Sequence, residues 1–554
     1  MNIQINNVAE FIVSCLEEEG VKYVFGIPGE ENIKLVRAID RSDKIRFILV
    51  RHEQAAAFMA DIYGRLTGSA GVCTATLGPG AINLILGVAD AQTDSSPLVA
   101  ITAQVGLNRI YKESHQIVDL VSLFKPVTKW SDVVLTPASV PEMVRKAFQA
   151  AQEERPGATY LAIPQDIEAM EMPEGAIPLT ASLQHKKMPT VQGIEAASRL
   201  LRAAKKPVIM AGHGVARTGN SNALSAFVEQ YQVPVATTFM GKGVLSDRHP
   251  LAMGVIGFMR HDYENFAFDE ADVILSVGYE LQEFDPARIN PNADKKIIHI
   301  NTFSPDTDKH YNADVVLEGD IGLSLAALGK ALGGEPLASF SGSNKIRSLL
   351  QEELESGQND ARFPLKPQRI VADIRAALND DDIVLADTGA IKMWMARLYP
   401  TYAPLTCLIS NGLSTMAFSL PGALGAKLAY PQRNVLAVMG DGSFMMNSQE
   451  IETAIRENIP LKVLIWVDDS YGLIKWKMDM EEGAHSSVDF GNPDFVKYAE
   501  SFGASGYYVD RAEALLPILK QALSEEGVSI IACPVDYSEN MKLIEKLGSL
   551  TIPL

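Results

Sequence analysis

The chain has 554 residues, of which 47% are hydrophobic and 21% are charged, which is typical of a globular protein with about three domains. Its formal net charge of −19 argues against nucleic acid or an anionic membrane as a partner, because phosphate contacts need clustered Lys and Arg. The four cysteines form no Cys-x-x-Cys pair, the N-terminus has no signal-peptide pattern, and no run of about 18 apolar residues exists, so we expect a reduced, cytoplasmic protein that does not cross a membrane.

The first third of the sequence alternates between predicted helices and predicted strands. A helix is expected at 8–20, and strands are expected at 22–27, 45–50, 71–76, 97–102 and 159–163. This alternation is typical of a doubly wound α/β domain with a parallel sheet. Glu53 lies at a junction between a strand and a helix, where a carboxylate either stabilises the helix dipole or takes part in chemistry.

The middle of the chain repeats the pattern and is separated from its neighbours by two predicted linkers, 171–195 and 335–366. Its strands are expected near 206–211, 233–238, 272–277, 296–301 and 314–318. The turn Ala211-Gly-His-Gly-Val215 is only a fragment of a dinucleotide-binding fingerprint and is weak support for a nucleotide site. The predicted domains are therefore 1–170, 190–335 and 366–554.

The last third of the chain carries two aspartates at the ends of two predicted strands. The apolar run 434–439 leads into Gly440-Asp441-Gly442-Ser443, a helix is expected at 448–456, and the apolar run 461–467 ends at Asp468. Neighbouring parallel strands would bring Asp441 and Asp468 together at the carboxyl edge of the sheet, where α/β folds bind ligands. Two carboxylates and nearby phosphate oxygens suit Mg²⁺, whereas the alternative is a solvated Asp-Gly turn beside an acidic loop.

This segment resembles the metal–diphosphate motif of the thiamine-diphosphate enzymes, Gly-Asp-Gly followed some two dozen residues later by Asn or Asp. The resemblance implies that Asp441, Asp468 and the backbone carbonyl of Ser470 bind Mg²⁺. Asp468 is similar to the variant found in catabolic acetolactate synthases, because the family more often has Asn at this position.

The N-terminal third resembles the pyrimidine-binding domain of the acetolactate synthase group. The matching segments, in order, are Phe25-Gly-Ile-Pro-Gly29, His52-Glu-Gln54, Leu77-Gly-Pro-Gly-Ala81 with Asn83, and Ile101-Thr-Ala-Gln-Val105. The resemblance implies that Glu53 is catalytic, because in that family this Glu hydrogen-bonds N1′ of the aminopyrimidine and enables acid–base chemistry through the cofactor ring. It also implies three doubly wound α/β domains with parallel sheets, namely a pyrimidine-binding, a central Rossmann-like and a diphosphate-binding domain.

The same resemblance implies further contacts with thiamine diphosphate. Met416 would hold the cofactor in a bent shape, and the carbonyl of Ser414 would accept a hydrogen bond from the 4′-amino group. The other residues expected to bind the cofactor are Pro79, Asn83, Gly389, Ala390, Ile391, Gly440, Gly442, Ser443, Tyr471, Gly472 and Leu473, together with Glu53, Asp441 and Asp468.

Three polar residues are expected in the substrate pocket: His115, Gln116 and Gln165. Their surroundings are similar to those of catabolic acetolactate synthases rather than biosynthetic ones, and Gln116 is also a candidate catalytic residue. For His115, a position in a surface loop is an equally good interpretation.

The resemblance covers nearly the whole chain and implies an acetolactate synthase of the catabolic type. With thiamine diphosphate and Mg²⁺, it would decarboxylate pyruvate and join the product to a second pyruvate, giving 2-acetolactate and CO₂. A homodimer or homotetramer with the active site at the subunit interface is implied. FAD is not expected, because residues 278–286 are similar to the catabolic version of this segment. The alternatives are another thiamine-diphosphate-dependent 2-keto acid decarboxylase or carboligase, an FAD-containing acetohydroxyacid synthase catalytic subunit, and a non-enzymatic role.

Overall fold

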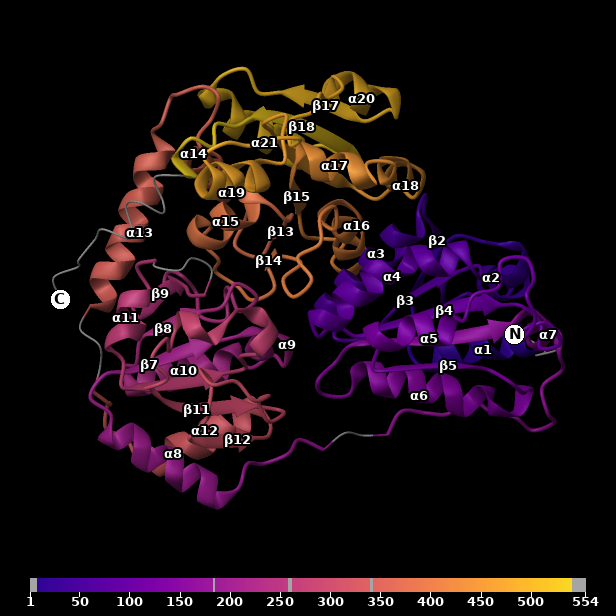
Figure 1. Ribbon diagram of the computed structural model, residues 1–554, viewed down its shortest axis with the longest axis horizontal. Helices are drawn as coiled ribbons and strands as arrows, with labels where there is room; N and C mark the ends of the chain where they lie inside the picture. Colours follow the sequence, from indigo (N-terminus) through magenta and orange to yellow (C-terminus); the bar gives the residue numbers. More distant parts are fainter. Residues whose placement is uncertain (1–6, 183–184, 258–261, 339–341, 541–554) are drawn as a thin grey trace.

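The computed structural model describes residues 7–182, 185–257, 262–338 and 342–540. Three parallel sheets of six strands each, interleaved with helices, confirm the predicted α/β fold class. Figure 1 shows the three sheets in separate units, with the C-terminal unit next to both of the others. Residues 1–6, on which the signal-peptide prediction partly depended, lie outside the described residues, as do 183–184 and 339–341 in the two predicted linkers.

The N-terminal unit has apolar cores on both faces of its sheet, as expected of a doubly wound domain. Its strands in spatial order are β2 (Arg46–Leu49), β1 (Tyr23–Gly26), β3 (Gly71–Ala75), β4 (Leu98–Gln104), β6 (Ala158–Pro164) and β5 (Trp130–Val133). Its helices are α1 (Val8–Glu18), α2 (Ile33–Asp40), α3 (Glu53–Thr67), α4 (Pro79–Thr93), α5 (Leu120–Phe124), α6 (Val140–Gln152) and α7 (Gln165–Ala169).

The central unit also buries apolar residues on both faces of its sheet. Its strands in spatial order are β12 (Val315–Glu318), β11 (Lys296–Asn301), β10 (Val273–Val277), β7 (Pro207–Ala211), β8 (Val235–Thr237) and β9 (Ala252–Val255). Its helices are α8 (Val191–Ala203), α9 (His213–Arg217), α10 (Ser221–Tyr231), α11 (Asn265–Glu270) and α12 (Ile321–Leu332).

The C-terminal unit contains the two strands that end at the predicted metal ligands. Its strands in spatial order are β14 (Cys407–Leu408), β13 (Ile383–Ala386), β15 (Val435–Gly440), β16 (Leu461–Val467), β18 (Val528–Pro534) and β17 (Ser505–Tyr508). Its helices are α14 (Pro367–Ala377), α15 (Ala390–Leu398), α16 (Ser419–Ala429), α17 (Asp441–Asn447), α18 (Glu450–Arg456), α19 (Gly472–Glu482), α20 (Phe495–Ser501) and α21 (Leu515–Ser524).

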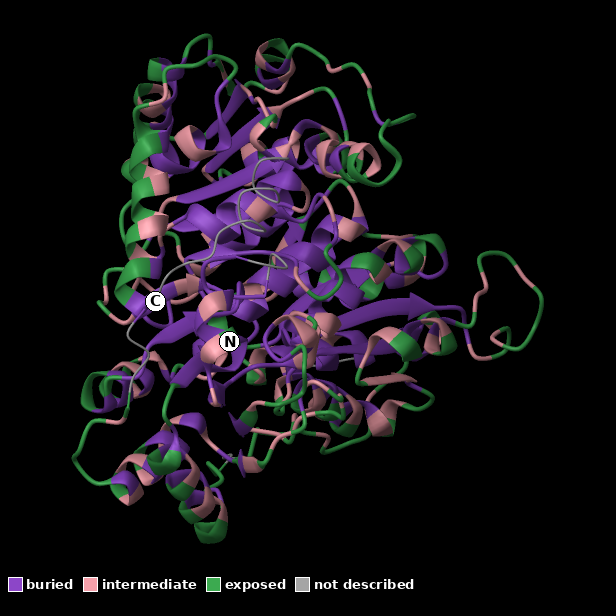
Figure 2. Ribbon diagram, turned by 60° about the vertical axis from the view of Figure 1, so that its left-hand side comes forward, coloured by how far each residue is buried: buried purple, intermediate pink, exposed green. Residues whose placement is uncertain are grey.

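Several elements differ from the prediction, and most of them lack a continuous apolar run. Strands β5, β9 and β17, which were not predicted, lie at sheet edges. Strands β5 and β17 are only partly buried, so their sequences contain no apolar run that would indicate a strand. The buried strand β18 was missed although its residues are apolar. The second predicted linker contains helix α13 (Ser343–Gln358), which buries few side chains. Figure 2 shows the same contrast, with buried strands inside and exposed residues on outer helices and loops.

None of the described helices has the length and the apolar composition needed to cross a bilayer. The predicted helix at 448–456 corresponds to α18, and a separate helix, α17, precedes it directly after β15. The chain therefore changes from strand to helix at Asp441 itself. This change fixes the position of the Asp441 carboxylate at the carboxyl edge of the sheet.

Helix α3 begins at Glu53, directly after strand β2 and its short connection. The Nδ1 atom of His52 caps the helix by accepting the N–H of Gln54 at 3.1 Å. Gly68 ends the helix in a left-handed conformation with φ of 72°, which favours glycine. Both ends of α3 are therefore set by local sequence, and the start of the helix places Glu53 at the carboxyl edge of the sheet.

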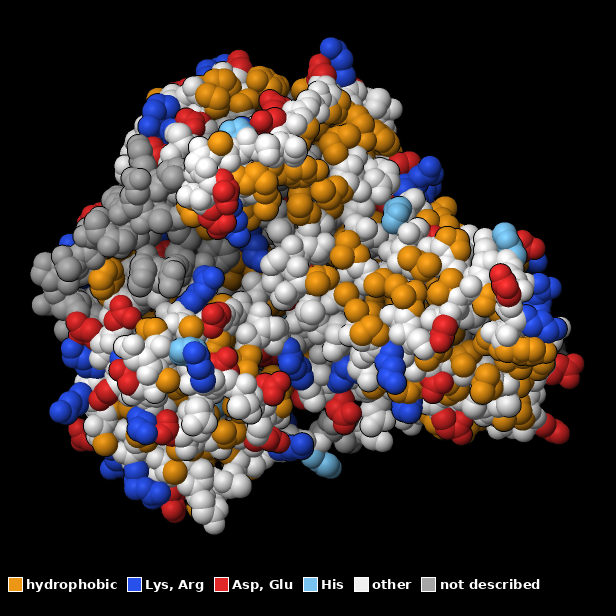
Figure 3. Space-filling model, in the orientation of Figure 1, with side chains coloured by type: hydrophobic (Ala, Val, Ile, Leu, Met, Phe, Trp, Pro, Cys, Tyr) orange, Lys and Arg blue, Asp and Glu red, His pale blue; other side chains and the backbone are white. Residues whose placement is uncertain are grey.

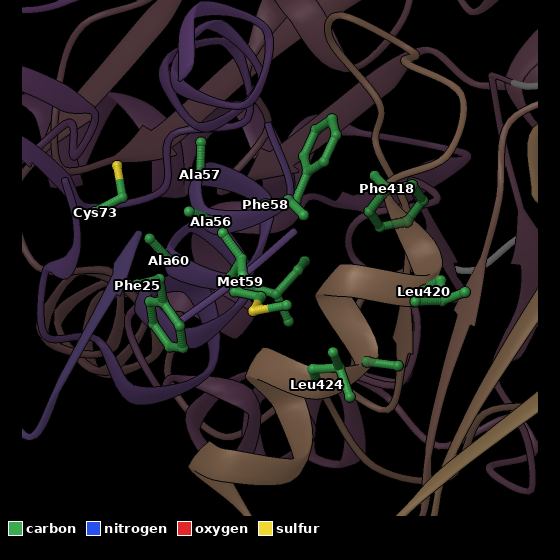
Figure 4. Packing of buried hydrophobic residues seen from close by; sticks show 14 of the residues in the cluster. Phe25, Ala56, Ala57, Phe58, Met59, Ala60, Cys73, Phe418, Leu420 and Leu424 are labelled. Carbon is green, nitrogen blue, oxygen red and sulfur yellow. The ribbon is translucent and has the colours of Figure 1, made fainter. Parts of the chain in front are cut away.

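Helix α3 also joins the N-terminal unit to the C-terminal unit by packing against α16. Figure 4 shows Phe58 and Met59 of α3 close to Phe418 and Leu424 at α16. All four side chains are fully buried, within a single apolar cluster that contains residues of both units. Gly425 lies at this crossing, where an added Cβ would be 2.4 Å from the carbonyl oxygen of Met59.

We expect Gly425→Ala to destabilise the protein, because the new methyl group would clash with backbone atoms of α3. Unlike a side chain, the backbone cannot avoid the clash by changing its rotamer. Overpacking of this kind costs about 1–3 kcal/mol, which exceeds the ~1 kcal/mol that Ala gains over Gly in a helix. The measurement is the thermal unfolding midpoint. Gly334→Ala, outside any helix, is the control for the added methyl group alone, because nothing lies within 4 Å of its added Cβ. An unchanged midpoint for Gly425→Ala would contradict the packing described here.

Candidate active site

The carboxyl edge of the C-terminal sheet brings Asp441 and Asp468 together. Strands β15 and β16 are adjacent and parallel, with Gly440 opposite Trp466, so the residues that follow them leave the sheet at the same level. The Oδ2 atom of Asp441 accepts the backbone N–H groups of Asp468 at 3.1 Å and of Asp469 at 2.7 Å. The carboxylate of Asp441 thus ties the end of one strand to the loop that follows the other.

The two carboxylates are close enough to influence each other's protonation. Burial raises the pKa of Asp441, although hydrogen bonds from the backbone and from Asn492 oppose this effect. Burial and the charge of Asp441 together raise the pKa of Asp468 to about 7. A bound cation would relieve this repulsion, and carboxylate oxygens are ligands that Mg²⁺ prefers. The donor set therefore fits the predicted metal.

The remaining ligands of a cation would have to be other oxygen atoms. No group of three or more His, Cys, Asp and Glu side chains that fits a metal ion occurs within the described parts of the chain. The hydroxyl of Ser470 donates to Oδ2 of Asp468 at 2.8 Å, so Ser470 lies beside the pair. Two carboxylates, one backbone carbonyl and phosphate oxygens form a shell that suits Mg²⁺ without a third acidic side chain.

A cavity of about 120 Å³ opens beside this pair of carboxylates. Thirteen of its sixteen lining residues were predicted from the sequence: Gly389, Ala390, Ile391, Met416, Gly440, Asp441, Gly442, Ser443, Asp468, Ser470, Tyr471, Gly472 and Leu473. The other three are Thr388, Ile474 and Tyr537. Helices α15 and α19 both begin at residues that line the cavity, and the positive ends of their helix dipoles favour an anion there.

Two glycines allow the chain to approach this cavity closely. Gly389 has φ of 137°, in the region that only glycine adopts readily, and α15 begins at the next residue. At Gly472, a Cβ would lie 2.6 Å from Oδ2 of Asp468. Side chains at these two positions would distort the backbone at the start of α15 or displace the carboxylate of Asp468.

Asp387, at the end of β13, is a residue whose importance the sequence did not reveal. Its fully buried carboxylate accepts hydrogen bonds from the backbone N–H groups of Thr388, Ala417 and Ser419, and from the hydroxyl of Ser443. The hydroxyl of Ser443 also accepts the N–H of Ala417. One aspartate therefore fixes three segments that border the cavity. A strand ending in Asp387-Thr388-Gly389 was a visible signal, but the long-range partners of the carboxylate were not.

The residues predicted in the N-terminal unit form a separate group. The Oε2 atom of Glu53 accepts a hydrogen bond from Nδ2 of Asn83 at 3.0 Å, and a Cβ at Gly80 would lie 3.1 Å from Oε1 of Glu53. The backbone of Gln116 packs against Gly78. Gly78 directly precedes Pro79, which is exposed and begins α4. Glu53, Pro79, Asn83 and Gln116 are thus gathered around the start of α4.

Among the described residues, the cavity beside Asp441 does not extend to the group around Glu53. None of the described lining residues of the cavity beside Asp441 comes from the N-terminal unit. His115, Gln116 and Gln165 are exposed, so the structure does not place them in a closed pocket. Ser414, predicted to contact the cofactor through its carbonyl, is not among the lining residues, whereas Met416 is. The described residues therefore place the predicted site residues in two separate groups.

Comparison with known proteins identifies the same three units. Residues 6–123, 194–328 and 387–533 match the N-terminal TPP binding domain, the central domain and the C-terminal TPP binding domain of thiamine pyrophosphate enzymes. The chain is 37% identical to the acetolactate synthase of Bacillus subtilis, over 97% of this chain and 95% of the relative. It is 35% identical to the catabolic acetolactate synthase of Raoultella terrigena, over 97% of each chain. It is 36% identical to a probable acetolactate synthase large subunit of Methanocaldococcus jannaschii, over 98% of this chain and 94% of the relative.

We expect Asp468→Ala to weaken Mg²⁺ binding by at least about tenfold, because one of two adjacent carboxylate ligands is lost. Asp468→Asn keeps an oxygen at the same place and is the matched control, with an expected change of only a few-fold. The measurement is calorimetric titration with Mg²⁺ in the presence of inorganic pyrophosphate. Equal affinities for wild-type protein and Asp468→Ala would exclude Asp468 as a ligand.

Proposed function

The chain belongs to the acetolactate synthase family of thiamine pyrophosphate enzymes, and we propose that it converts two molecules of pyruvate into 2-acetolactate and CO₂. The observation that carries this proposal is the pair Asp441 and Asp468 at the mouth of a cavity where helices α15 and α19 begin. A diphosphate and its cation need both features, which ordinary surface turns do not combine.

When bound, thiamine diphosphate supplies a carbon nucleophile and an electron sink for the removal of CO₂ from a 2-oxo acid. Asp441, Asp468 and the backbone carbonyl of Ser470 would hold Mg²⁺, and the first turns of α15 and α19 would hold the diphosphate. The apolar side chains of Ile391 and Met416 line the same cavity and would exclude water from the reacting end of the cofactor.

Glu53 would act on the opposite end of the cofactor, at the aminopyrimidine. Its Oε2 atom accepts a hydrogen bond from Asn83, and its Oε1 atom lies close to Gly80. These contacts support a fixed orientation of the Glu53 carboxylate. We assign a hydrogen bond between Glu53 and the ring nitrogen N1′, which sets the protonation of the 4′-amino group. Gln116, His115 and Gln165 are assigned to the pyruvate side of the site.

A second copy of the chain would complete the site. The cavity of about 120 Å³ is smaller than the roughly 300–1,000 Å³ typical of ligand pockets, and the group around Glu53 lies outside it. Exposed apolar side chains lie near both half-sites: Ile82 and Leu86 on α4, Met445 and Met446 on α17, Leu413 in the loop before α16, and Tyr471 and Ile474 at the start of α19. Figure 3 shows hydrophobic side chains gathered on one face of the molecule, over the N-terminal and C-terminal units.

The structure of the central unit supports the proposal that FAD is not bound. Dinucleotide phosphates bind backbone N–H groups at the turn after the first strand of such a domain. Here the carboxylate of Glu283 accepts the N–H of His213 at 3.2 and 3.3 Å and that of Glu280 at 3.0 Å. It also accepts a hydrogen bond from the hydroxyl of Thr238. The side chain of Glu283 thus occupies the N–H of His213, which a phosphate at the turn after β7 would need.

Two related activities remain distinct from the proposed one by their products. A thiamine-dependent decarboxylase without carboligation would release acetaldehyde from pyruvate and form no acetolactate. The FAD-containing relatives would need flavin for full activity.

The four cysteines are free and buried, which supports the proposed location in a reducing cytoplasm.

We expect the purified protein to form acetolactate from pyruvate with thiamine diphosphate and Mg²⁺, as measured by conversion of the product to acetoin. Glu53→Gln should lower kcat by about 10²–10⁴-fold, because an amide cannot exchange a proton with the ring nitrogen. Its affinity for Mg²⁺ and pyrophosphate should stay unchanged, since those ligands bind the other half-site. Acetaldehyde as the sole product would overturn the proposed reaction.

Co-expression of Glu53→Gln with Asp441→Ala tests whether two chains share each site. Random pairing of two inactive variants makes half of the dimers mixed, and each mixed dimer has one site with both wild-type residues. We therefore expect about a quarter of wild-type activity from the mixture. Activity no higher than that of either variant alone would show that Glu53 and Asp441 serve the same chain's site.

The addition of FAD should not change the rate of acetolactate formation, and the purified protein should show no yellow flavin absorption. The physical reason is the side chain of Glu283, which already accepts the N–H of His213 at the turn after β7. The measurement is the initial rate with and without FAD after extensive dialysis. A rate that rises with added FAD would assign the protein to the flavin-containing group.

A further inference from the structure

Lys392 is a buried cation beside the proposed cofactor site. It lies on α15, one residue after Ile391, which lines the cavity, and its residue exposure is 7%. Its Nζ atom donates to the carbonyl oxygen of Ser410 at 2.7 Å and to Oγ of Ser414 at 2.9 Å. Neither contact is explained by binding of Mg²⁺, diphosphate or pyruvate.

The contact with Ser414 holds a residue in an uncommon backbone conformation. Ser414 has φ of 53°, in the left-handed region that residues other than glycine seldom adopt. Its hydroxyl donates to the carbonyl of Asn411 at 2.7 Å and accepts from Lys392. These two hydrogen bonds fix the side chain of Ser414 relative to the backbone and hence favour one direction for its carbonyl.

The rest of the loop at 410–416 is held from the N-terminal unit. The carboxylate of Asp94 accepts the N–H groups of Asn411 at 2.9 Å and of Gly412 at 2.6 Å. Asp90 accepts from the hydroxyl of Ser410, and that hydroxyl accepts the N–H of Thr415 at 2.8 Å. Lys392 therefore adds an anchor from the C-terminal unit at the point where the loop reaches Ser414.

The surrounding charges favour a protonated Lys392 despite its burial. Asp94, Asp90 and Asp387 act on it electrostatically, while desolvation lowers its pKa to about 8. Arg65 is the second cation in this region, and it pairs with Asp61 and Asp94. At neutral pH the side chain is thus an ammonium group, whose hydrogen bonds are stronger than those of a neutral donor.

We propose that Lys392 is a positioning residue that holds the carbonyl of Ser414 ready to accept a hydrogen bond from the 4′-amino group of thiamine diphosphate. This inference rests on the proposed function, because it assumes that the cofactor binds in the cavity beside Asp441. It assigns Lys392 a role in recognising the amino group of the pyrimidine, whereas Asp441 and Asp468 recognise the other end of the cofactor.

The alternative is that Lys392 only satisfies buried polar groups. Lys462 is a matched control for this alternative, because it is also buried in the C-terminal unit. Its Nζ atom donates to the carbonyls of Glu525 and Gly527 and to the hydroxyl of Ser529, and burial lowers its pKa to about 8 as well. Lys462 is not among the residues that line the cavity.

The experiment compares the affinities of Lys392→Met and Lys462→Met for thiamine diphosphate and for the analogue without its 4′-amino group, measured by calorimetry with Mg²⁺. In the wild type we expect the analogue to bind about tenfold more weakly, as for one lost hydrogen bond. Lys392→Met should lose most of this discrimination, while Lys462→Met should keep it. Full discrimination in Lys392→Met would overturn the inference.

Ser414→Ala provides a second test that does not remove a charge. It deletes the hydroxyl that Lys392 contacts, so it should lower the discrimination as Lys392→Met does, and the two changes combined should add little more. Additive losses would contradict a shared role. If the wild type binds thiamine diphosphate and forms acetolactate but Lys392→Met discriminates normally, only this inference fails. If the wild type does neither, the proposed function itself fails.

Discussion

The candidate site depends on one carboxylate that connects two strand ends. Asp441 accepts the N–H groups of Asp468 and Asp469 across the gap between β15 and β16, so the loop after β16 cannot move independently of the start of α17. This tie places two acidic side chains together in a partly dry environment, where they repel each other. A divalent cation would remove that repulsion, so the proposed metal–diphosphate complex would relieve an unfavourable contact that the fold imposes.

The C-terminal unit also positions Glu53, the residue that we propose to act at the opposite end of the cofactor. Glu450, on α18, is fully buried and accepts the backbone N–H groups of Arg51 and His52 at 3.1 and 3.0 Å, directly before Glu53. Together with the packing of α3 on α16, this contact fixes the start of α3 relative to the C-terminal sheet of the same chain. In a dimer of the proposed kind, the unit that binds one cofactor would thus orient the glutamate that serves the other.

Sequence patterns predicted the parts of the molecule that depend on local order. Apolar runs located the central strands, and the aspartates after two of them were identified as neighbours because parallel strands end at one edge. Long-range contacts could not be read in this way. The four hydrogen bonds to Asp387 come from residues up to 56 positions away, and nothing near Lys392 indicates that its ammonium group reaches Ser414. Edge strands such as β17 were missed because partial burial removes the apolar signal.

Buried charges at the junction of the N-terminal and C-terminal units explain why loop 410–416 adopts one shape. Asp90 and Asp94 come from α4, Arg65 comes from α3, and Lys392 comes from α15, so each unit supplies both the loop's hydrogen-bond partners and part of the charge balance. An apolar junction would bury area more cheaply, but it would leave the backbone of the loop unsatisfied. The cost of burying these charges is therefore tied to the backbone of loop 410–416, which ends at Met416 in the lining of the cavity beside Asp441.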